Sequence, residues 1–88
     1  MLVRFFAAAH AAAGVDEERH ELGDRATLDE LLTAILAVDR PDPPAGTPPL
    51  ARIITRSSFL RNEISVRDRT AVLSPDDVVD VLPPFAGG

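Results

Sequence analysis

Cysteine is absent from the whole sequence, and so are lysine, tyrosine and tryptophan. The absence of cysteine excludes disulfide bonds, thiolate catalysis and zinc sites built on cysteine. No apolar run approaches the ~20 residues that a membrane-spanning helix needs. The first six residues lack the basic start and the long apolar stretch of a signal peptide. These absences predict a cytoplasmic protein with no membrane partner.

Size and charge narrow the class of protein further. A chain of 88 residues forms one domain, which buries only ~60–65% of the surface that the unfolded chain exposes. The formal net charge is −5, and the excess of acid lies in residues 1–44, which hold four arginines and nine carboxylates. Residues 45–88 hold five of each. Because an acidic protein repels a phosphate backbone, we expect no nucleic-acid partner.

The beginning of the chain predicts a strand, a short helix and a second strand. Over residues 1–7 the side chains alternate between two faces, which is the period of a half-buried strand: Met1, Val3 and Phe5 share one face, and Leu2, Arg4 and Phe6 share the other. An alanine-rich helix is expected over Ala7–Ala13, because Gly14 follows it in the position typical of a C′ residue. A second strand is expected over Glu18–Leu22, followed by a turn at Gly23–Asp24.

The clearest helical pattern covers residues 28–38. Thr27 and Glu30 have the spacing of a capping box. Helical periodicity then gives one apolar face, formed by Leu28, Leu31, Leu32, Ile35 and Leu36. Five prolines between Pro41 and Pro49 end this helix and predict an extended surface loop.

The second half predicts one more short helix and three strands. Thr47 is a candidate cap for a helix that begins near residue 48 or 49 and carries Leu50, Ile53 and Ile54. Strands are expected over residues 56–61 and 64–66, joined by a tight turn at Asn62-Glu63 because asparagine tolerates positive φ. A turn at residues 73–77 leads into a nearly all-apolar strand, residues 78–82. Strands at both ends around one good helix indicate an α+β domain, with that helix packed across a mixed sheet.

The chain ends in two prolines, two further residues and two glycines. Pro83 and Pro84 cannot donate the hydrogen bonds of a sheet, so the last strand stops there. They also hold the chain extended and direct it away from the body of the domain. Gly87 and Gly88 carry no side chain, so a narrow channel can admit the backbone and the terminal carboxylate. The alternative is a frayed terminus without a function.

Four segments give the sequence a resemblance to a known family: Phe5–Ala7, the helix that begins at Thr27, Leu73–Val79 and Pro83–Gly88. Together they resemble the small, sulfur-carrying subunit of molybdopterin synthase, a ubiquitin-like β-grasp family that ends in a hydrophobic strand, Pro-Pro, two variable residues and Gly-Gly. The resemblance covers almost the whole chain. Two features depart from it: Asp76 stands where the family commonly has glycine, and the Pro41–Pro49 loop is longer.

This resemblance implies a fold and a division of the chain. The expected fold is a ubiquitin-like β-grasp of the α+β class, with a mixed sheet packed against one main helix and additional short helices. The β-grasp domain would cover residues 1–84. Residues 85–88 would form a flexible C-terminal Gly-Gly tail.

The resemblance also implies a chemistry in which the carboxylate of Gly88 is the reactive group. An activating enzyme would use ATP to join this carboxylate to AMP, and sulfur from a donor would then replace AMP to give a thiocarboxylate. The large catalytic subunit of molybdopterin synthase would hold the tail, including Phe85, Ala86 and Gly87, while the sulfur passes to a pterin precursor. One hard substitution is thereby divided into two easier ones. The chain itself is expected to bind no cofactor and no metal, and to have no internal catalytic site.

Energetics indicate that the folded body must help to bind these partners. Fixing four tail residues costs ~1–2 kcal/mol each in backbone entropy, and Gly-Gly offers little apolar area to offset that cost. We therefore expect an apolar patch on one sheet face to dock first. Phe6 and Leu82 match apolar interface positions of the family, and Pro83 and Pro84 adjoin them. The alternative is that Phe6 and Leu82 are ordinary core residues.

Two other kinds of site compete with this interpretation. His10 and His20 are candidate zinc ligands together with nearby glutamates, but their spacing matches no standard site, so exposed histidines are the simpler interpretation. An RNA-binding surface is suggested by Arg52, Arg56, Arg61, Arg67 and Arg69. Five carboxylates in the same half, and the lack of tyrosine and tryptophan for stacking, favour a solvated face or contacts to an acidic partner instead.

The pathway is left open by the sequence. Related carriers serve thiamine synthesis, cysteine synthesis or tRNA thiolation, although the thiamine carrier is typically shorter and lacks the two prolines. A ubiquitin-like protein modifier, attached through its terminal glycine to lysines of other proteins, is a further alternative.

Overall fold

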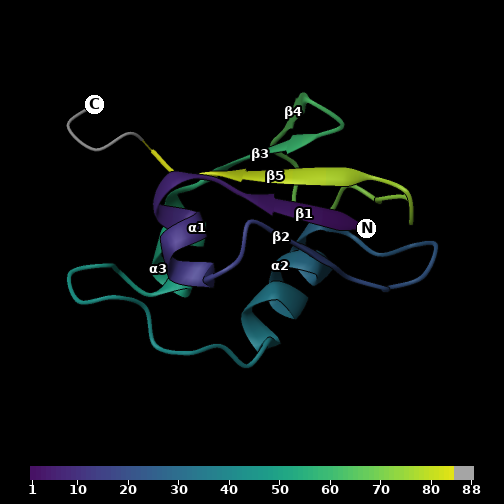
Figure 1. Ribbon diagram of the computed structural model, residues 1–88. Helices are drawn as coiled ribbons and strands as arrows, with labels where there is room; N and C mark the ends of the chain where they lie inside the picture. Colours follow the sequence, from purple (N-terminus) through teal and green to yellow (C-terminus); the bar gives the residue numbers. More distant parts are fainter. Residues whose placement is uncertain (85–88) are drawn as a thin grey trace.

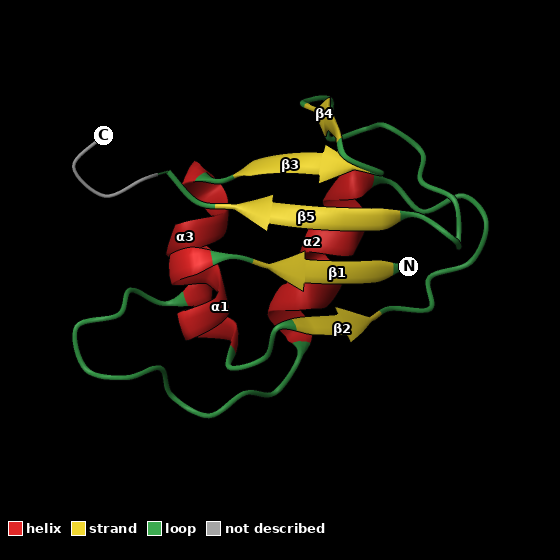
Figure 2. Ribbon diagram, turned by 45° about the horizontal axis from the view of Figure 1, so that its top comes forward, coloured by secondary structure: helices red, strands yellow, loops and turns green. Residues whose placement is uncertain are grey.

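Five strands and three helices form two layers in the computed structural model, which describes residues 1–84. Figure 2 shows the sheet in front and all three helices behind it, so one sheet face is covered and the other is open. The strands are β1 (Leu2–Phe5), β2 (Glu17–Arg19), β3 (Ser58–Arg61), β4 (Ile64–Val66) and β5 (Val78–Leu82). The helices are α1 (Ala7–Ala13), α2 (Leu28–Ala37) and α3 (Leu50–Arg56). The prediction of an α+β domain with a mixed sheet across one main helix is confirmed.

The sheet has the order β2-β1-β5-β3-β4. β1 and β5, the first and last strands in the sequence, are therefore neighbours inside the sheet. β1 and β5 run parallel, with Phe5 opposite Val81, while the other neighbouring pairs are antiparallel. Parallel strands end at the same edge of a sheet, so the end of β5 meets the turn from β1 into α1. Figure 1 shows the chain leaving β5 beside α1 and α3, at the opposite end of the sheet from the N-terminus. We call this end, marked by Leu82, Pro83 and Pro84, the exit end, and the end where β5 begins, at Asp77 and Val78, the anchor end.

The predicted alternation in the first strand is confirmed. Met1, Val3 and Phe5 are buried beneath the helices, whereas Leu2 and Arg4 are half-buried on the open face. Phe59 of β3 and the β5 residues Val79 and Val81 complete the covered face, and the last two are fully buried. The core therefore lies between the central strands and the helices, and it includes side chains of both β1 and β5, the first and last strands of the chain.

Local signals placed most helix boundaries correctly. α1 ends at Gly14, whose φ of 81° is the left-handed conformation that glycine adopts without strain. α2 begins with the predicted capping box: Glu30 donates its backbone N–H to Thr27 Oγ1 at 3.2 Å, and Thr27 donates its N–H to Glu30 Oε1 at 3.0 Å. Leu36 was wrongly placed on the buried face, since it is 43% exposed. Successive side chains of an α-helix are rotated by ~100° about the helix axis, so Leu36 lies about 90° from the centre of that face.

Three predicted boundaries are wrong. β2 ends at Arg19 rather than Leu22, because the chain that it pairs with begins at Met1, which bonds to His20 through the His20 N–H at 2.9 Å and the His20 carbonyl at 2.7 Å. Thr47 is not a helix cap: Pro49 occupies that position, and no side chain caps α3. Arg56 ends α3 instead of starting a strand, where its charge suits the negative end of the helix dipole.

The hairpin between β3 and β4 has the predicted tight turn. Asn62 and Glu63 both have positive φ, 49° and 70°, which matches the twist of a two-residue hairpin loop. Within residues 1–84, no helix is both long enough and apolar enough to span a membrane.

Candidate functional site

Phe6 and Leu82 lie side by side at the exit end, although 76 positions separate them in the sequence. The Phe6 N–H donates to the Val81 carbonyl at 3.3 Å, which extends the pairing of β1 and β5 by one residue. Phe6 is 41% exposed, and Leu82 is half-buried. Neither belongs to the buried core, so both present apolar surface where the chain leaves the sheet.

The chain turns sharply immediately after Phe6. Ala7 has a φ of 49°, a left-handed conformation that costs a residue with a side chain about 1–2 kcal/mol. This turn takes the chain from β1 into α1, and Phe6 becomes the residue that precedes the helix. Strain of this kind is often kept at functional sites. Sequence reasoning missed it, because alanine carries no signal for a left-handed conformation.

The open sheet face carries an ion pair at its centre in which the carboxylate is buried and the guanidinium is partly exposed. Arg4 donates two hydrogen bonds to Asp80, Nε to Oδ1 at 2.6 Å and Nη2 to Oδ2 at 3.0 Å. Asp80 is only 4% exposed, and the bond and charge of its carboxylate raise the pKa of Arg4. The pair neutralises itself, so this face offers an incoming partner little net charge. Half-buried Leu2, Val78 and Leu60 surround it on the open side of the sheet.

A groove of about 280 Å³ lies beside the two prolines at the exit end. It is lined by Ala8, Pro48, Arg52, Ile53, Arg56, Pro83 and Pro84. The groove therefore joins α1 and α3 to the end of β5. Pro83 and Pro84 were predicted site residues, but the contribution of α3 was not predicted.

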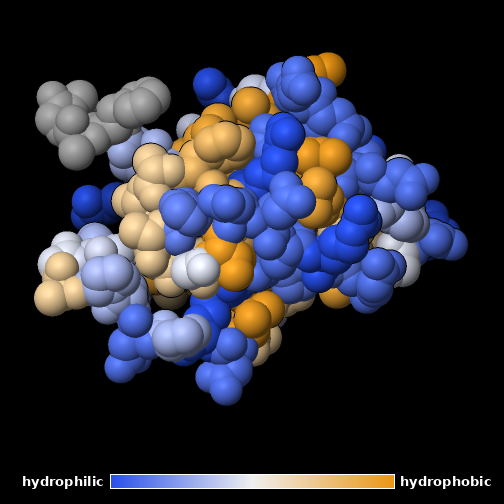
Figure 3. Space-filling model, viewed as in Figure 1, coloured by the Kyte–Doolittle hydropathy of each residue, from blue (hydrophilic) through white to orange (hydrophobic). Residues whose placement is uncertain are grey.

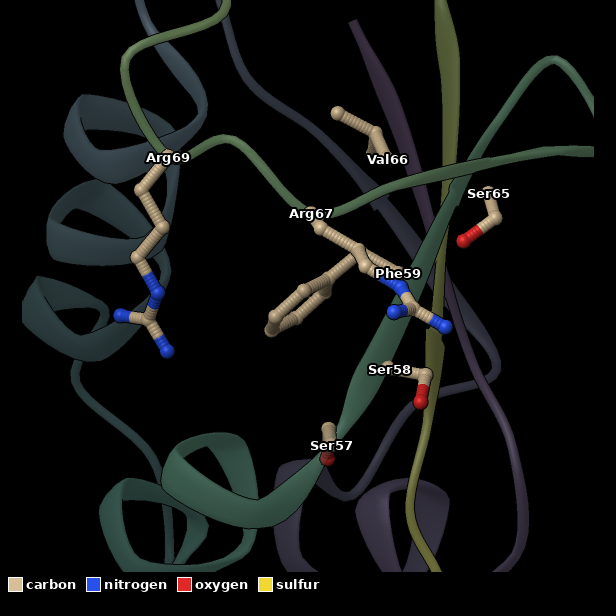
Figure 4. Close-up of a pocket in the computed structure, with 7 residues that line it drawn as sticks. All are labelled: Ser57, Ser58, Phe59, Ser65, Val66, Arg67 and Arg69. Atoms are coloured by element: carbon tan, nitrogen blue, oxygen red, sulfur yellow. The ribbon is translucent and has the colours of Figure 1, made fainter.

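A second pocket, of about 320 Å³, opens along β3 and the loop after β4 (Figure 4). Its lining combines Phe59 and Val66 with three serines and two arginines, namely Ser57, Ser58, Ser65, Arg67 and Arg69. The guanidinium of Arg69 lies 5.8 Å from the centre of the Phe59 ring. Hydroxyl and guanidinium groups suit an acidic ligand, and the lining holds neither histidine nor carboxylate to act as a general base.

The anchor end contrasts with the exit end because a carboxylate is tightly bound there. Asp77 is 6% exposed and accepts hydrogen bonds from Arg61 Nε at 2.8 Å, Asn62 Nδ2 at 2.9 Å and the Ser74 N–H at 2.8 Å. Burial alone would raise the pKa of Asp77, but these bonds and the charge of Arg61 outweigh it and lower the pKa. Asn62 also accepts from the Val78 N–H at 2.9 Å, which ties the β3–β4 turn to the start of β5.

The two histidines contact different carboxylates, and His20, expected to be exposed, has a side chain that is only 10% exposed. His10 Nε2 is 3.0 Å from Asp16 Oδ1, and His20 Nε2 is 2.7 Å from Glu18 Oε2. Glu18 also accepts two bonds from Arg40, at 2.8 and 2.7 Å. Burial would raise the pKa of Glu18, but the bonds from Arg40 and His20 lower it. Across the described part of the chain, no three histidine or carboxylate side chains gather as metal ligands.

The predicted reactive residue and its tail lie outside the described residues. These are Phe85, Ala86, Gly87 and Gly88. Their role, and the division of the chain into a domain over residues 1–84 and a tail over residues 85–88, stay predictions.

Comparison with known proteins gives one family. The model of the ThiS family matches residues 3–88. A curated protein of Chlamydomonas reinhardtii, the molybdopterin synthase sulfur carrier subunit, is 34% identical over 88 residues, which cover 98% of this chain and 95% of that protein.

Solved structures confirm the β-grasp prediction for the fold. SAMP1 from Haloferax volcanii superimposes with a TM-score of 0.77 at 22% identity, covering 100% of this chain and 98% of its own. The putative molybdopterin converting factor, subunit 1, from Pyrococcus furiosus gives a TM-score of 0.70 at 24% identity, covering 96% of this chain and 95% of its own.

Proposed function

Because the chain belongs to the ThiS family, we propose that it is a sulfur carrier and the small subunit of molybdopterin synthase in molybdenum cofactor biosynthesis. The observation that carries the proposal is the 34% identity, over nearly the full length of both chains, to a molybdopterin synthase sulfur carrier subunit. The terminal sequence Pro-Pro-Phe-Ala-Gly-Gly supports it, since it resembles the ending of such carriers.

The proposed chemistry takes place at the carboxylate of Gly88 and needs no catalytic side chain in this protein. A carboxylate oxygen attacks the α-phosphorus of ATP on the activating enzyme, and pyrophosphate leaves. Hydrosulfide supplied by the donor then attacks the carbonyl carbon, the C–O bond to AMP breaks, and AMP leaves with the bonding electrons. The product is a thiocarboxylate, which delivers its sulfur within the large catalytic subunit. This division into two easier steps is the logic of covalent catalysis.

Features of the exit end support a role as the docking surface for the partner that holds this tail. Pro83 and Pro84 end the pairing of β5, and Phe6 and Leu82 present apolar surface directly beside them. Apolar contact there would offset the backbone entropy of fixing the tail, which costs ~1–2 kcal/mol per residue. We expect the large subunit to dock on this surface while it holds Phe85 to Gly88. The cytoplasm, where ATP is available, is the expected location.

Intact-mass measurement tests the first half of the proposal. The protein is incubated with ATP, its cognate activating enzyme and a sulfur donor. We expect the mass gain of one sulfur replacing one oxygen, located at Gly88 by fragmentation. A stable isopeptide bond to other proteins, with no sulfur gain, would instead identify a protein modifier.

Reconstitution tests the pathway. The thiocarboxylated protein is mixed with the large subunit of molybdopterin synthase and the pterin precursor. Conversion of the precursor, with return of the carrier to its original mass, is the expected result. Sulfur gain without any conversion would assign the carrier to another sulfur-transfer pathway.

A further inference from the structure

The groove at the exit end is lined by positive charge, although the protein is acidic. Two of its lining residues, Arg52 and Arg56, come from α3, and none of the seven is a carboxylate. Residues four apart lie on the same face of a helix, so both guanidinium groups border the same apolar floor. Ala8 and Ile53 contribute to that floor, and Pro83 and Pro84 form the side from which the chain leaves. Figure 3 shows apolar surface gathered over α1, near the place where the chain leaves the domain.

Within residues 1–84, four of the nine arginines have a carboxylate partner, whereas Arg52 and Arg56 are among the five that have none. Arg4, Arg40, Arg61 and Arg69 each have a carboxylate partner within 4 Å. The exposed side chains of Arg52 and Arg56 make no hydrogen bond or ion pair with any described residue. Like charges at this spacing destabilise an isolated helix, although the helix dipole partly compensates at Arg56. Stability of the fold therefore does not explain the pair.

The position of the pair indicates what it would meet. Any protein that encloses the residues after Pro84 must approach this groove. Guanidinium groups bind carboxylates through two parallel hydrogen bonds, and removal of water at an interface strengthens such pairs. An acidic segment would find opposite charge at the groove, although the chain as a whole has a net charge of −5.

We propose that Arg52 and Arg56 form a recognition site for an acidic segment of the protein that holds the C-terminal tail. The inference rests on the proposed function, because only a tail-holding partner has to cover the groove. The site would steer the partner to the exit end and orient the tail toward its active site. Electrostatic pairs at such a position raise the association rate and select among partners more than they add affinity.

A charge-reversal pair with a matched control tests the site. Arg52→Glu/Arg56→Glu is compared with Arg19→Glu/Arg25→Glu, which changes the net charge equally. Arg19 and Arg25 are also exposed and make no ion pair with a described residue, but they lie away from the groove. The dissociation constants for the activating enzyme and for the large subunit are measured. We expect the first variant to bind at least one of them about ten-fold more weakly, and the control to stay within about two-fold.

Two further measurements test the site: the salt dependence of binding, and the affinity of a variant in which both arginines are replaced by uncharged residues. Binding of the wild-type protein should weaken with added salt, and binding of the reversed variant should weaken less, because screening acts on the pairs that reversal has removed. Arg52→Gln/Arg56→Gln should bind with intermediate affinity. Melting curves that match those of the wild type show that both variants fold.

The outcomes separate this site from the function on which it rests. If the wild type gains sulfur and the reversed variant binds both proteins within about two-fold of the control, the site is refuted and the proposed function stands. If no sulfur is gained, yet the reversed variant binds one of the two proteins about ten-fold more weakly than the control, the recognition site stands and the sulfur-carrier assignment fails.

Discussion

The two ends of β5 use charged residues in opposite ways. At the anchor end, Asp77 is buried and receives three hydrogen bonds from the β3–β4 turn and from Ser74. At the exit end, two exposed arginines border an apolar groove without any carboxylate in its lining. One end therefore satisfies its polar groups internally, while the other leaves charge and apolar surface for something outside the domain.

This difference separates stability from function along a single strand. Buried polar groups that lose a partner are costly, so changes at the anchor end should lower the stability of the fold. Exposed groups contribute little to stability, so changes at the exit end should weaken partner binding and leave the fold intact. Four predictions test this separation, beginning with the largest effect.

Deletion of Gly88 should abolish sulfur transfer and leave the fold unchanged. The terminal carboxylate would then belong to Gly87 and would stand ~3.5 Å short of its place in the partner's active site. A displacement of this size should lower the rate at least about 100-fold. Intact mass after activation measures sulfur gain, and a melting curve reports the fold. Normal delivery of sulfur by the shortened protein would disprove the role of Gly88.

Asp77→Ala should destabilise the domain by about 2–3 kcal/mol, because it removes three hydrogen bonds to a charged group. For a domain of this size the melting temperature should fall by about 10–20 °C. Below that temperature the variant should still gain sulfur, since Asp77 lies at the opposite end from the tail. Asp76→Ala, at the exposed neighbouring position, is the control and should melt like the wild type. If the two variants melted at the same temperature, the hydrogen bonds of Asp77 would not stabilise the fold.

Phe6→Ala should weaken binding of the large subunit about ten-fold, which corresponds to about 1.4 kcal/mol. The melting temperature should change little, because the ring is already 41% exposed in the free protein. Ile64→Ala is the control: this side chain is 73% exposed but lies at the β3–β4 turn. Titration calorimetry gives both dissociation constants. If both variants bind the large subunit like the wild type, Phe6 takes no part in docking.

Asp77→Asn should reduce the loss of unfolding free energy as the pH falls into the acidic range. This is the smallest of the four effects. The pKa of Asp77 is lower in the folded protein than in the unfolded chain, so its contribution is present above the unfolded value, near ~3.9, and is lost as the pH falls through the folded value. Glu18 shifts in the same direction, so part of the slope should remain in the variant. Urea unfolding between neutral and strongly acidic pH measures the slope. Asp76→Asn, the control, should retain the wild-type slope.

The candidate site was only partly visible in the sequence. Phe6, Leu82, Pro83 and Pro84 were singled out because they match a family pattern, and the structure places all four at one end of the sheet. Arg52 and Arg56 were interpreted as part of a solvated face or as contacts to an acidic partner, but their place beside Pro83 and Pro84 was not predicted, because it depends on how α3 packs. The left-handed Ala7 was missed as well, since its cause lies in the junction of β1 with α1.

The sequence by itself determined the features that depend on a few neighbouring residues. Alternation in β1, the capping box at Thr27, the glycine that ends α1 and the prolines that end β5 all act through local backbone geometry or a short hydrophobic period. Only the tertiary structure decided which distant segments meet. Arg4 pairs with Asp80 across 76 positions because β1 and β5 lie parallel, and α3 reaches Pro83 and Pro84 because it packs beside α1. Such contacts depend on how whole elements bury their apolar faces together, which no short segment encodes.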